Sequence, residues 1–198
     1  LKESFIPILK EAGFSIELTC RKEGFFPCGG GEYFVQINKR ENSLQKIHLD
    51  DRLSEQKLSF EILHTESDRQ AAKKVKETLI NSGILQAQIT STKSSAEGRG
   101  LVILARVQEK DHTMILSEFG IKRFDPSEVA KRILKQVESY LDSGYFVDEH
   151  LADQLMIPML FCGGSFSSAE LSSHSETNIE TIEAFLGKVF EVKGREVK

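Results

Sequence analysis

The sequence predicts an α+β fold that contains a small compact unit. Its 198 residues are enough for one full domain or for one domain plus a small insertion. A hydrophobic share of 39% and a charged share of 28% are typical of a soluble globular protein. Amphipathic helical patterns alternate with short β-branched stretches, and residues 59–119 form a compact strand–helix–strand pattern of their own.

Composition excludes several classes of protein. No apolar run is long enough to span a bilayer, and the longest, "LMIPMLFCGG", is broken by Pro158. A net charge of −4 does not indicate a nucleic-acid binder unless basic residues cluster locally. The chain has three cysteines, Cys20, Cys28 and Cys162, which is an odd number and lacks the spacing of metal ligands, so we expect a reducing, cytoplasmic location. The shortness of the apolar runs predicts no membrane association.

The N-terminal residues predict a helix followed by two strands. "LKESFIPILKEAGF" is amphipathic and ends at Gly13, and because the chain opens directly on it, we expect the C-terminal portion of a longer protein or a processed or truncated form. "FSIELTCRK" and "EYFVQI" alternate as strands on either side of the triple glycine 29–31. That triplet could cradle a phosphate, but a tight strand connection is favoured because no Lys-Ser/Thr pair follows.

The compact unit from Ser59 to Phe119 is predicted from its internal pattern. "SDRQAAKKVKETLINSG" indicates a helix with Ser67 as N-cap and Gly83 as stop, and its lysines are expected to form a solvated face rather than an RNA contact. "SSAEGRG" is expected to be a polar, mobile connection. The expected strands are "SFEILH", "LQAQITSTK", "LVILARVQ" and "HTMILSEFG".

Two further helices are predicted after this unit. Asp125 as cap, Pro126 at the first helical position and Glu128 make the clearest helix start in the chain. In "VDEHLADQLMIPML", His150, Asp153 and Gln154 fall at i, i+3 and i+4 and therefore share one helical face. These side chains are either solvent-facing or, beside an apolar run, engaged with polar partners.

His174 lies in "LSSHSETNIE", and we expect it just ahead of a helix that has Thr177 as N-cap and Glu180 completing a capping box. A helix N-terminus disfavours imidazolium and suits an approaching phosphate, so a neutral, nucleophilic ring is one interpretation. The other is a surface histidine beside a cap. A Gly turn and short strand in "FCGGSFSSAEL" precede this segment, and the strand "KVFEVK" follows it.

Three ordered motifs, "GFFPCGGGEYFV", "VDEHLADQLMIPM" and "SSHSETNIETIEAFL", resemble those of RNA 3′-terminal phosphate cyclases. The resemblance covers nearly the whole chain but only the C-terminal part of the usual family length. It implies an α/β sandwich built from repeated βαβαββ units, with a small α/β domain inserted in the last repeat. The implied division is a core of residues 1–58 and 120–198 and an insert of residues 59–119. Cys28 stands where the family commonly has a basic residue, which weakens a phosphate role for that loop.

The resemblance also implies a reaction: ATP-dependent conversion of an RNA 3′-phosphate to a 2′,3′-cyclic phosphate, through a histidine–AMP intermediate. It identifies His174 with the nucleophile and the residues His150, Leu151, Ala152, Asp153 and Gln154 with the nucleotide-contacting helix start. Asp153 is expected to orient His174 or contact the nucleotide, and Gln154 to contact base or ribose. The implied partners are ATP, RNA with a 3′-terminal phosphate and a divalent metal (Mg or Mn) held mainly by phosphate and water; a homo-oligomer is a further candidate assembly. The alternatives are a non-catalytic cyclase-like scaffold protein acting in ribosome assembly and a plain α/β interaction module.

Overall fold

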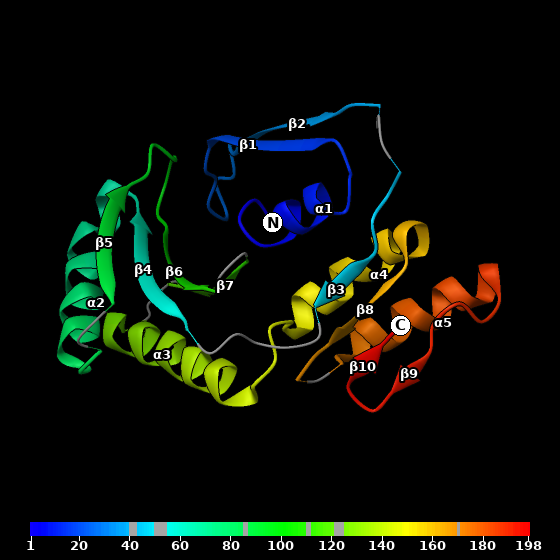
Figure 1. The fold of residues 1–198 in the computed structure, drawn as a ribbon. Helices are drawn as coiled ribbons and strands as arrows, with labels where there is room; N and C mark the ends of the chain where they lie inside the picture. The colour runs from blue at the N-terminus through cyan, green and yellow to red at the C-terminus, as the bar shows by residue number, and fades with distance from the viewer. Residues whose placement is uncertain (40–42, 50–54, 85–86, 110–111, 121–124, 170) are drawn as a thin grey trace. The chain divides into compact units, whose positions relative to one another are not determined.

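The computed structural model describes the chain in segments that fold into two compact units (Figure 1). The described residues are 1–39, 43–49, 55–84, 87–109, 112–120, 125–169 and 171–198. The first unit comprises Leu1–Glu17, Gln36–Ser54 and Tyr140–Lys198, and the second comprises Leu18–Val35 and Glu55–Ser139. The bounds predicted from the resemblance, with an insert of residues 59–119, stay a prediction.

The second unit is built on a four-stranded sheet in the order β5-β4-β6-β7. Its strands are β4 (Lys57–His64), β5 (Gln88–Lys93), β6 (Leu101–Gln108) and β7 (Thr113–Phe119). β4 and β5 are parallel, whereas β6 is antiparallel to both β4 and β7. Every second β6 residue from Leu101 to Val107 is buried, as expected for a strand that faces the core. Residues 85–86, at the start of one predicted strand, lie outside the described residues.

Two helices bury apolar faces in this unit. In α2 (Arg69–Asn81), Ala72, Val75 and Leu79 follow helical spacing and are buried. In α3 (Pro126–Ser143), Val129, Ala130, Ile133 and Val137 do the same. The α3 start agrees with the prediction, because the Ser127 N–H donates to Asp125 Oδ1 at 2.9 Å.

The predicted α2 start at Ser67 is wrong. A single 3₁₀ turn, η1 (Glu66–Asp68), precedes the helix, and Asp68 occupies the N-cap position. The Ser67 hydroxyl instead donates to the Gly98 carbonyl oxygen at 3.2 Å. The Gly98 carbonyl oxygen therefore competes with the helix start for the Ser67 hydroxyl. Because Gly98 lies 31 residues away, the local sequence could not reveal this competition.

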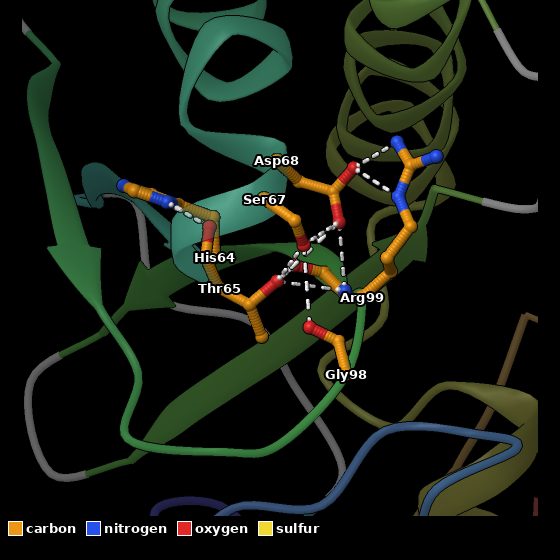
Figure 2. Close-up of polar contacts among 7 residues, drawn as sticks. His64, Thr65, Ser67, Asp68, Gly98 and Arg99 are labelled. Carbon is orange, nitrogen blue, oxygen red and sulfur yellow. Dashed lines mark hydrogen bonds and ion pairs between the residues drawn. The ribbon is translucent and has the colours of Figure 1, made fainter.

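Asp68 is the centre of a polar cluster that joins the start of α2 to the connection after β5 (Figure 2). Its Oδ1 accepts from Arg99 Nη2 at 2.6 Å, and its Oδ2 accepts from the Gly100 N–H at 2.9 Å. Thr65 and Ser67 hydroxyls donate to the same Oδ2. Burial works to raise the pKa of Asp68, but these donors, the Arg99 guanidinium first, bring it below its usual value. The polar "SSAEGRG" connection, expected to be mobile, is thus anchored at its end.

A hairpin contributes its tip to the same unit. β1 (Ile16–Lys22) pairs with β2 (Glu32–Ile37), and the turn between them has Gly29 and Gly30 at φ +65° and +76°. These positive φ values agree with the favoured interpretation of the triple glycine as a strand connection. The Gly29 N–H already donates to the Phe25 carbonyl oxygen at 2.8 Å, which leaves it unavailable to a phosphate.

The first unit carries a second four-stranded sheet, in the order β3-β8-β10-β9. β3 is parallel to β8, and β10 is antiparallel to β8 and β9. Leu155, Met156 and Phe166 are fully buried core side chains of this unit. Its elements are α1 (Phe5–Glu11), β3 (Ile47–Leu49), α4 (Glu149–Cys162), β8 (Gly164–Ser167), α5 (Ser173–Leu186), β9 (Val192–Lys193) and β10 (Glu196–Val197).

A glycine pair reverses the chain between α4 and β8, as the sequence predicted. Gly163 has φ +68°, and its N–H donates to the Met159 carbonyl oxygen at 2.8 Å, ending α4. Gly164 has φ +131° and lies opposite Ile47 in the β3–β8 ladder. A Cβ atom on Gly164 would overlap the Ile47 carbonyl group, so only glycine lets β3 approach. With helices and mixed sheets in both units, the predicted α+β class is confirmed.

Candidate functional site

The first part of the candidate site is the start of α4. Asp148 has extended backbone angles (φ −83°, ψ 174°), and its Oδ1 accepts from the Leu151 N–H at 2.7 Å. Leu151 and Ala152, two of the predicted nucleotide-contacting residues, have buried side chains, so only their backbone can meet a ligand. His150 is exposed, and Asp153 and Gln154 are half-buried on the same face of the helix.

The second part is the start of α5, and here the predicted cap is wrong. The helix begins at Ser173, five residues earlier than expected, because Ser172 has extended backbone angles and accepts the Ser175 N–H on its hydroxyl at 3.2 Å. Thr177 is inside the helix, where its hydroxyl donates to the Ser173 carbonyl oxygen at 2.8 Å. His174 therefore lies in the first turn of α5, exposed, and not ahead of the helix.

β8 brings the two helix starts to the same end of the first unit. α4 ends at the glycine pair, β8 then runs back along it, and α5 begins six residues after β8 ends. Val147, just before the α4 cap, forms a parallel bridge with Ser168, just after β8. The starts of α4 and α5 consequently lie at the carboxyl end of β8, the end of an α/β sheet at which ligands commonly bind.

A hydrogen bond connects Asp153, a predicted site residue of α4, to the helix that carries His174. The Asn178 side-chain amide donates to Asp153 Oδ1 at 2.7 Å. Asp153 was expected to orient His174 or to contact the nucleotide; the structure pairs it with Asn178, one helical turn beyond His174. Within the described part of the chain, no hydrogen bond or ion pair involves the His174 side chain. Sequence reasoning gave Asn178 no role, although its i+4 spacing from His174 was a usable signal.

The model of the family described as "RNA 3'-terminal phosphate cyclase" matches residues 1–192, almost the whole chain. The chain belongs to the RNA 3′-terminal phosphate cyclase family. The predicted resemblance is confirmed.

Three bacterial relatives, each named RNA 3′-terminal phosphate cyclase, are similar to this member of the family. The protein of Koribacter versatilis is 34% identical over 99% of this chain and 56% of its own length. The protein of Pseudomonas fluorescens is 32% identical over 94% of this chain and 55% of its own length. For that of Ectopseudomonas mendocina the values are 30%, 94% and 55%. The chain therefore spans about half the length of the curated relatives it matches.

Charge differs between the two helix starts of this cyclase-family chain. α4 begins with Asp148 and Glu149, two carboxylates that oppose the approach of a phosphate to that helix start. Burial raises the pKa of Asp148 above its usual value, and the Leu151 N–H bond offsets only part of that effect. α5 begins with three serines around His174, and Glu176 is the acidic residue of its first turn. The first N–H groups of a helix have no intrahelical acceptor, so the α5 start suits a phosphate better than the α4 start does.

Among the described residues, no group of three or more His, Cys, Asp or Glu side chains is arranged to hold a metal ion. A divalent cation at this site would take most of its ligands from phosphate oxygens and water, as Mg²⁺ commonly does. In the same part of the chain, no helix is both long and apolar enough to cross a membrane.

Proposed function

We propose that the protein containing this chain converts an RNA 3′-terminal phosphate to a 2′,3′-cyclic phosphate at the expense of ATP, with His174 as the residue that carries AMP. One observation carries the proposal: the exposed His174 lies in the first turn of the helix whose Asn178 is hydrogen-bonded to Asp153 of the "HLADQ" segment. The proposed nucleophile and the proposed nucleotide-contacting segment therefore lie at the same end of one sheet. Membership of the family supports the same reaction.

The proposed sequence starts at the His174 ring. A neutral imidazole nitrogen attacks the α-phosphorus of ATP, forming a P–N bond and releasing pyrophosphate. An oxygen of the RNA 3′-phosphate then attacks the same phosphorus, which forms a P–O bond and breaks the P–N bond. Finally, the neighbouring 2′-hydroxyl oxygen attacks the activated 3′-phosphorus, loses its proton and displaces AMP. A divalent metal, Mg or Mn, would offset the charge that builds on the phosphates.

The roles we assign follow from exposure and position. The α5 start receives the α-phosphate, because its first N–H groups and serine hydroxyls can donate hydrogen bonds to phosphate oxygens and its first turn contains one carboxylate, Glu176. Asp153 and Gln154 contact the ribose or base, and the exposed His150 lies on their face of α4. Leu151 and Ala152 hold that helix in the core. The three free cysteines are compatible with a cytoplasmic location, which we also propose.

The test is covalent labelling of the complete protein with α-labelled ATP. A phosphoramidate on His174 should survive alkali and neutral hydroxylamine and be lost in acid, unlike an acyl phosphate or an ester. His174→Asn should abolish labelling and leave the fold intact, because the side chain is exposed. His150→Asn should reduce labelling less, since that residue only positions the nucleotide. Undiminished label on the His174→Asn protein would overturn the assignment, and an unlabelled wild-type protein would favour the non-catalytic scaffold.

A further inference from the structure

The Asp153–Asn178 hydrogen bond is a cross-helix contact between two half-buried side chains. An ionised carboxylate only accepts hydrogen bonds, so the Asn178 amide must present its NH₂ group to it. The 2.7 Å distance is that of a short, charge-assisted bond. Because the Asn178 amide is neutral, it orients the Asp153 carboxylate and leaves its negative charge in place. A lysine or arginine at this position would neutralise that charge.

The bond lies one helical turn below each helix start. Asn178 is four residues after His174, and Asp153 is three residues after His150, so each pair shares a helix face. Side chains on a helix lean toward its N-terminus, which directs His174 and His150 to the open end beyond the bond. The Asp153–Asn178 pair therefore sets the separation of the faces on which the proposed nucleophile and nucleotide contacts lie.

The bond also leaves half of the carboxylate for a ligand. Only Oδ1 of Asp153 is engaged, and in the described part of the chain no second hydrogen bond reaches this side chain. Oδ2 can then accept from a ribose hydroxyl while Oδ1 stays fixed to α5.

We propose that Asn178 is a positioning residue, which holds Asp153 so that a nucleotide bound on α4 presents its α-phosphorus to His174 on α5. This inference rests on the proposed function. It assigns Asn178 to the geometry of AMP transfer and not to the affinity for ATP. Its loss should thus slow the covalent step at saturating ATP.

The experiment measures histidine–AMP formation in the complete protein at several ATP concentrations, in single turnover. Asn178→Ala should lower the rate at saturating ATP about tenfold or more, equivalent to about 1.4 kcal/mol in the barrier, with a much smaller change in the half-saturating concentration. Glu180→Gln, exposed on the same helix, is the matched control and should label at the wild-type rate. Thermal unfolding of each variant identifies any that fails to fold.

Asn178→Asp is a nearly isosteric second variant, which keeps the inference testable if the alanine variant unfolds. Two carboxyl groups at this distance cannot both ionise readily, so one pKa rises and a shared proton re-forms the bond at low pH. Its labelling rate, divided by that of the wild type, should rise severalfold as the pH falls from about 8 to about 5.5. A merely structural defect would not produce this pH profile at a temperature where the variant is folded.

The outcomes separate the two proposals. Wild-type labelling with slow Asn178→Ala and pH-dependent Asn178→Asp supports the positioning role. Wild-type rates in a folded Asn178→Ala protein, or a flat relative pH profile for Asn178→Asp, overturn that role and leave His174 as the AMP carrier. Absence of label on the wild-type protein overturns the proposed function and the positioning role together.

Discussion

Gly164 is a single residue on which the geometry of the first unit depends. Its positive φ and its contact with the Ile47 carbonyl both exclude a side chain. The same glycine lets β8 turn back along α4 and deliver the chain to α5. Backbone strain and steric overlap therefore act at one position, and their effects should be large there.

Gly164→Ala should destabilise the first unit by several kcal/mol or prevent it from folding, because buried steric overlap and an unfavourable φ add. Gly187→Ala is the matched control: Gly187 also has a positive φ, +76°, but a Cβ atom there would meet no heavy atom within 4 Å. It should cost about 1–3 kcal/mol, the strain of the backbone alone, because φ +76° with ψ −172° is a conformation almost confined to glycine. Urea denaturation of both variants measures the difference, and equal losses would contradict the proposed close approach.

Asp148 gives the start of α4 a pH dependence. Its pKa is raised in the folded state, so the folded protein holds this proton to a higher pH than the unfolded chain, whose pKa is about 3.9. The stability it contributes is present below that unfolded pKa and is lost as the pH rises through the folded one.

Asp148→Asn should keep an acceptor for the Leu151 N–H and remove this loss. Denaturation of the two proteins at a series of pH values from about 4 to 7 should show the variant gaining stability relative to wild type as the pH rises. Glu180→Gln, which changes an exposed carboxylate on another helix, provides the control. Parallel stability curves for Asp148→Asn and wild type would refute the expectation.

At the scale of single elements, the sequence predicted helices and strands well and their starts unevenly. Asp125 was identified as a cap because Pro126 at the first helical position and Glu128 three residues after Asp125 mark the helix start. Around His174, four hydroxyl residues can cap a helix: Ser172, Ser173, Ser175 and Thr177. The structure selects Ser172, with Ser175 fully buried beneath it, and burial is a tertiary property that no local pattern contains. The Asp153–Asn178 pairing was equally hidden, since it depends on the path of β8 between the two helices.

The start of α2 provides the element-scale prediction. The Asp68 side chain is 3% exposed and accepts from a backbone N–H, whereas Arg99 is 75% exposed. Asp68→Ala should cost about 1–3 kcal/mol because the Gly100 N–H and the Thr65 and Ser67 hydroxyls lose a buried acceptor, which leaves the Gly100 N–H only the Thr65 hydroxyl oxygen at 3.1 Å. Arg99→Gln should cost less because the hydroxyl and backbone donors to Asp68 remain. Chemical denaturation followed by hydrogen exchange at β4 and β6 compares them. A larger loss for Arg99→Gln would show that the ion pair dominates.

At the scale of the whole molecule, the division of the chain is a testable property. The resemblance predicted an insert of residues 59–119, whereas the second compact unit runs to Ser139 and includes the buried face of α3. Local sequence patterns could not decide to which unit α3 belongs, because the apolar face of a helix beside a domain boundary can pack against either of the two domains.

Removing residues 55–139 with a short linker should leave a better folded remainder than removing 59–119, which would expose Val129, Ile133 and Val137 of α3 to water. Circular dichroism and limited proteolysis of the two shortened proteins measure the outcome. A well-folded product from the 59–119 deletion alone would support the boundary predicted from the resemblance.

The parallel pairing of β3 with β8 has a consequence for the order of folding. The residues it joins are far apart in the chain: 117 positions separate His48 from Ser165, against 25 between Asp153 and Asn178. Closing a long loop costs conformational entropy, and this cost comes before the contact that closes the loop can stabilise the chain. A loop whose interior residues have already folded is effectively shorter, so its closure costs less. Residues 55–139 lie inside this loop and form their own sheet. Pulsed hydrogen exchange during refolding should therefore find the amides of β4 and β6 protected first, those of α4 and α5 next, and those joining β3 to β8 last.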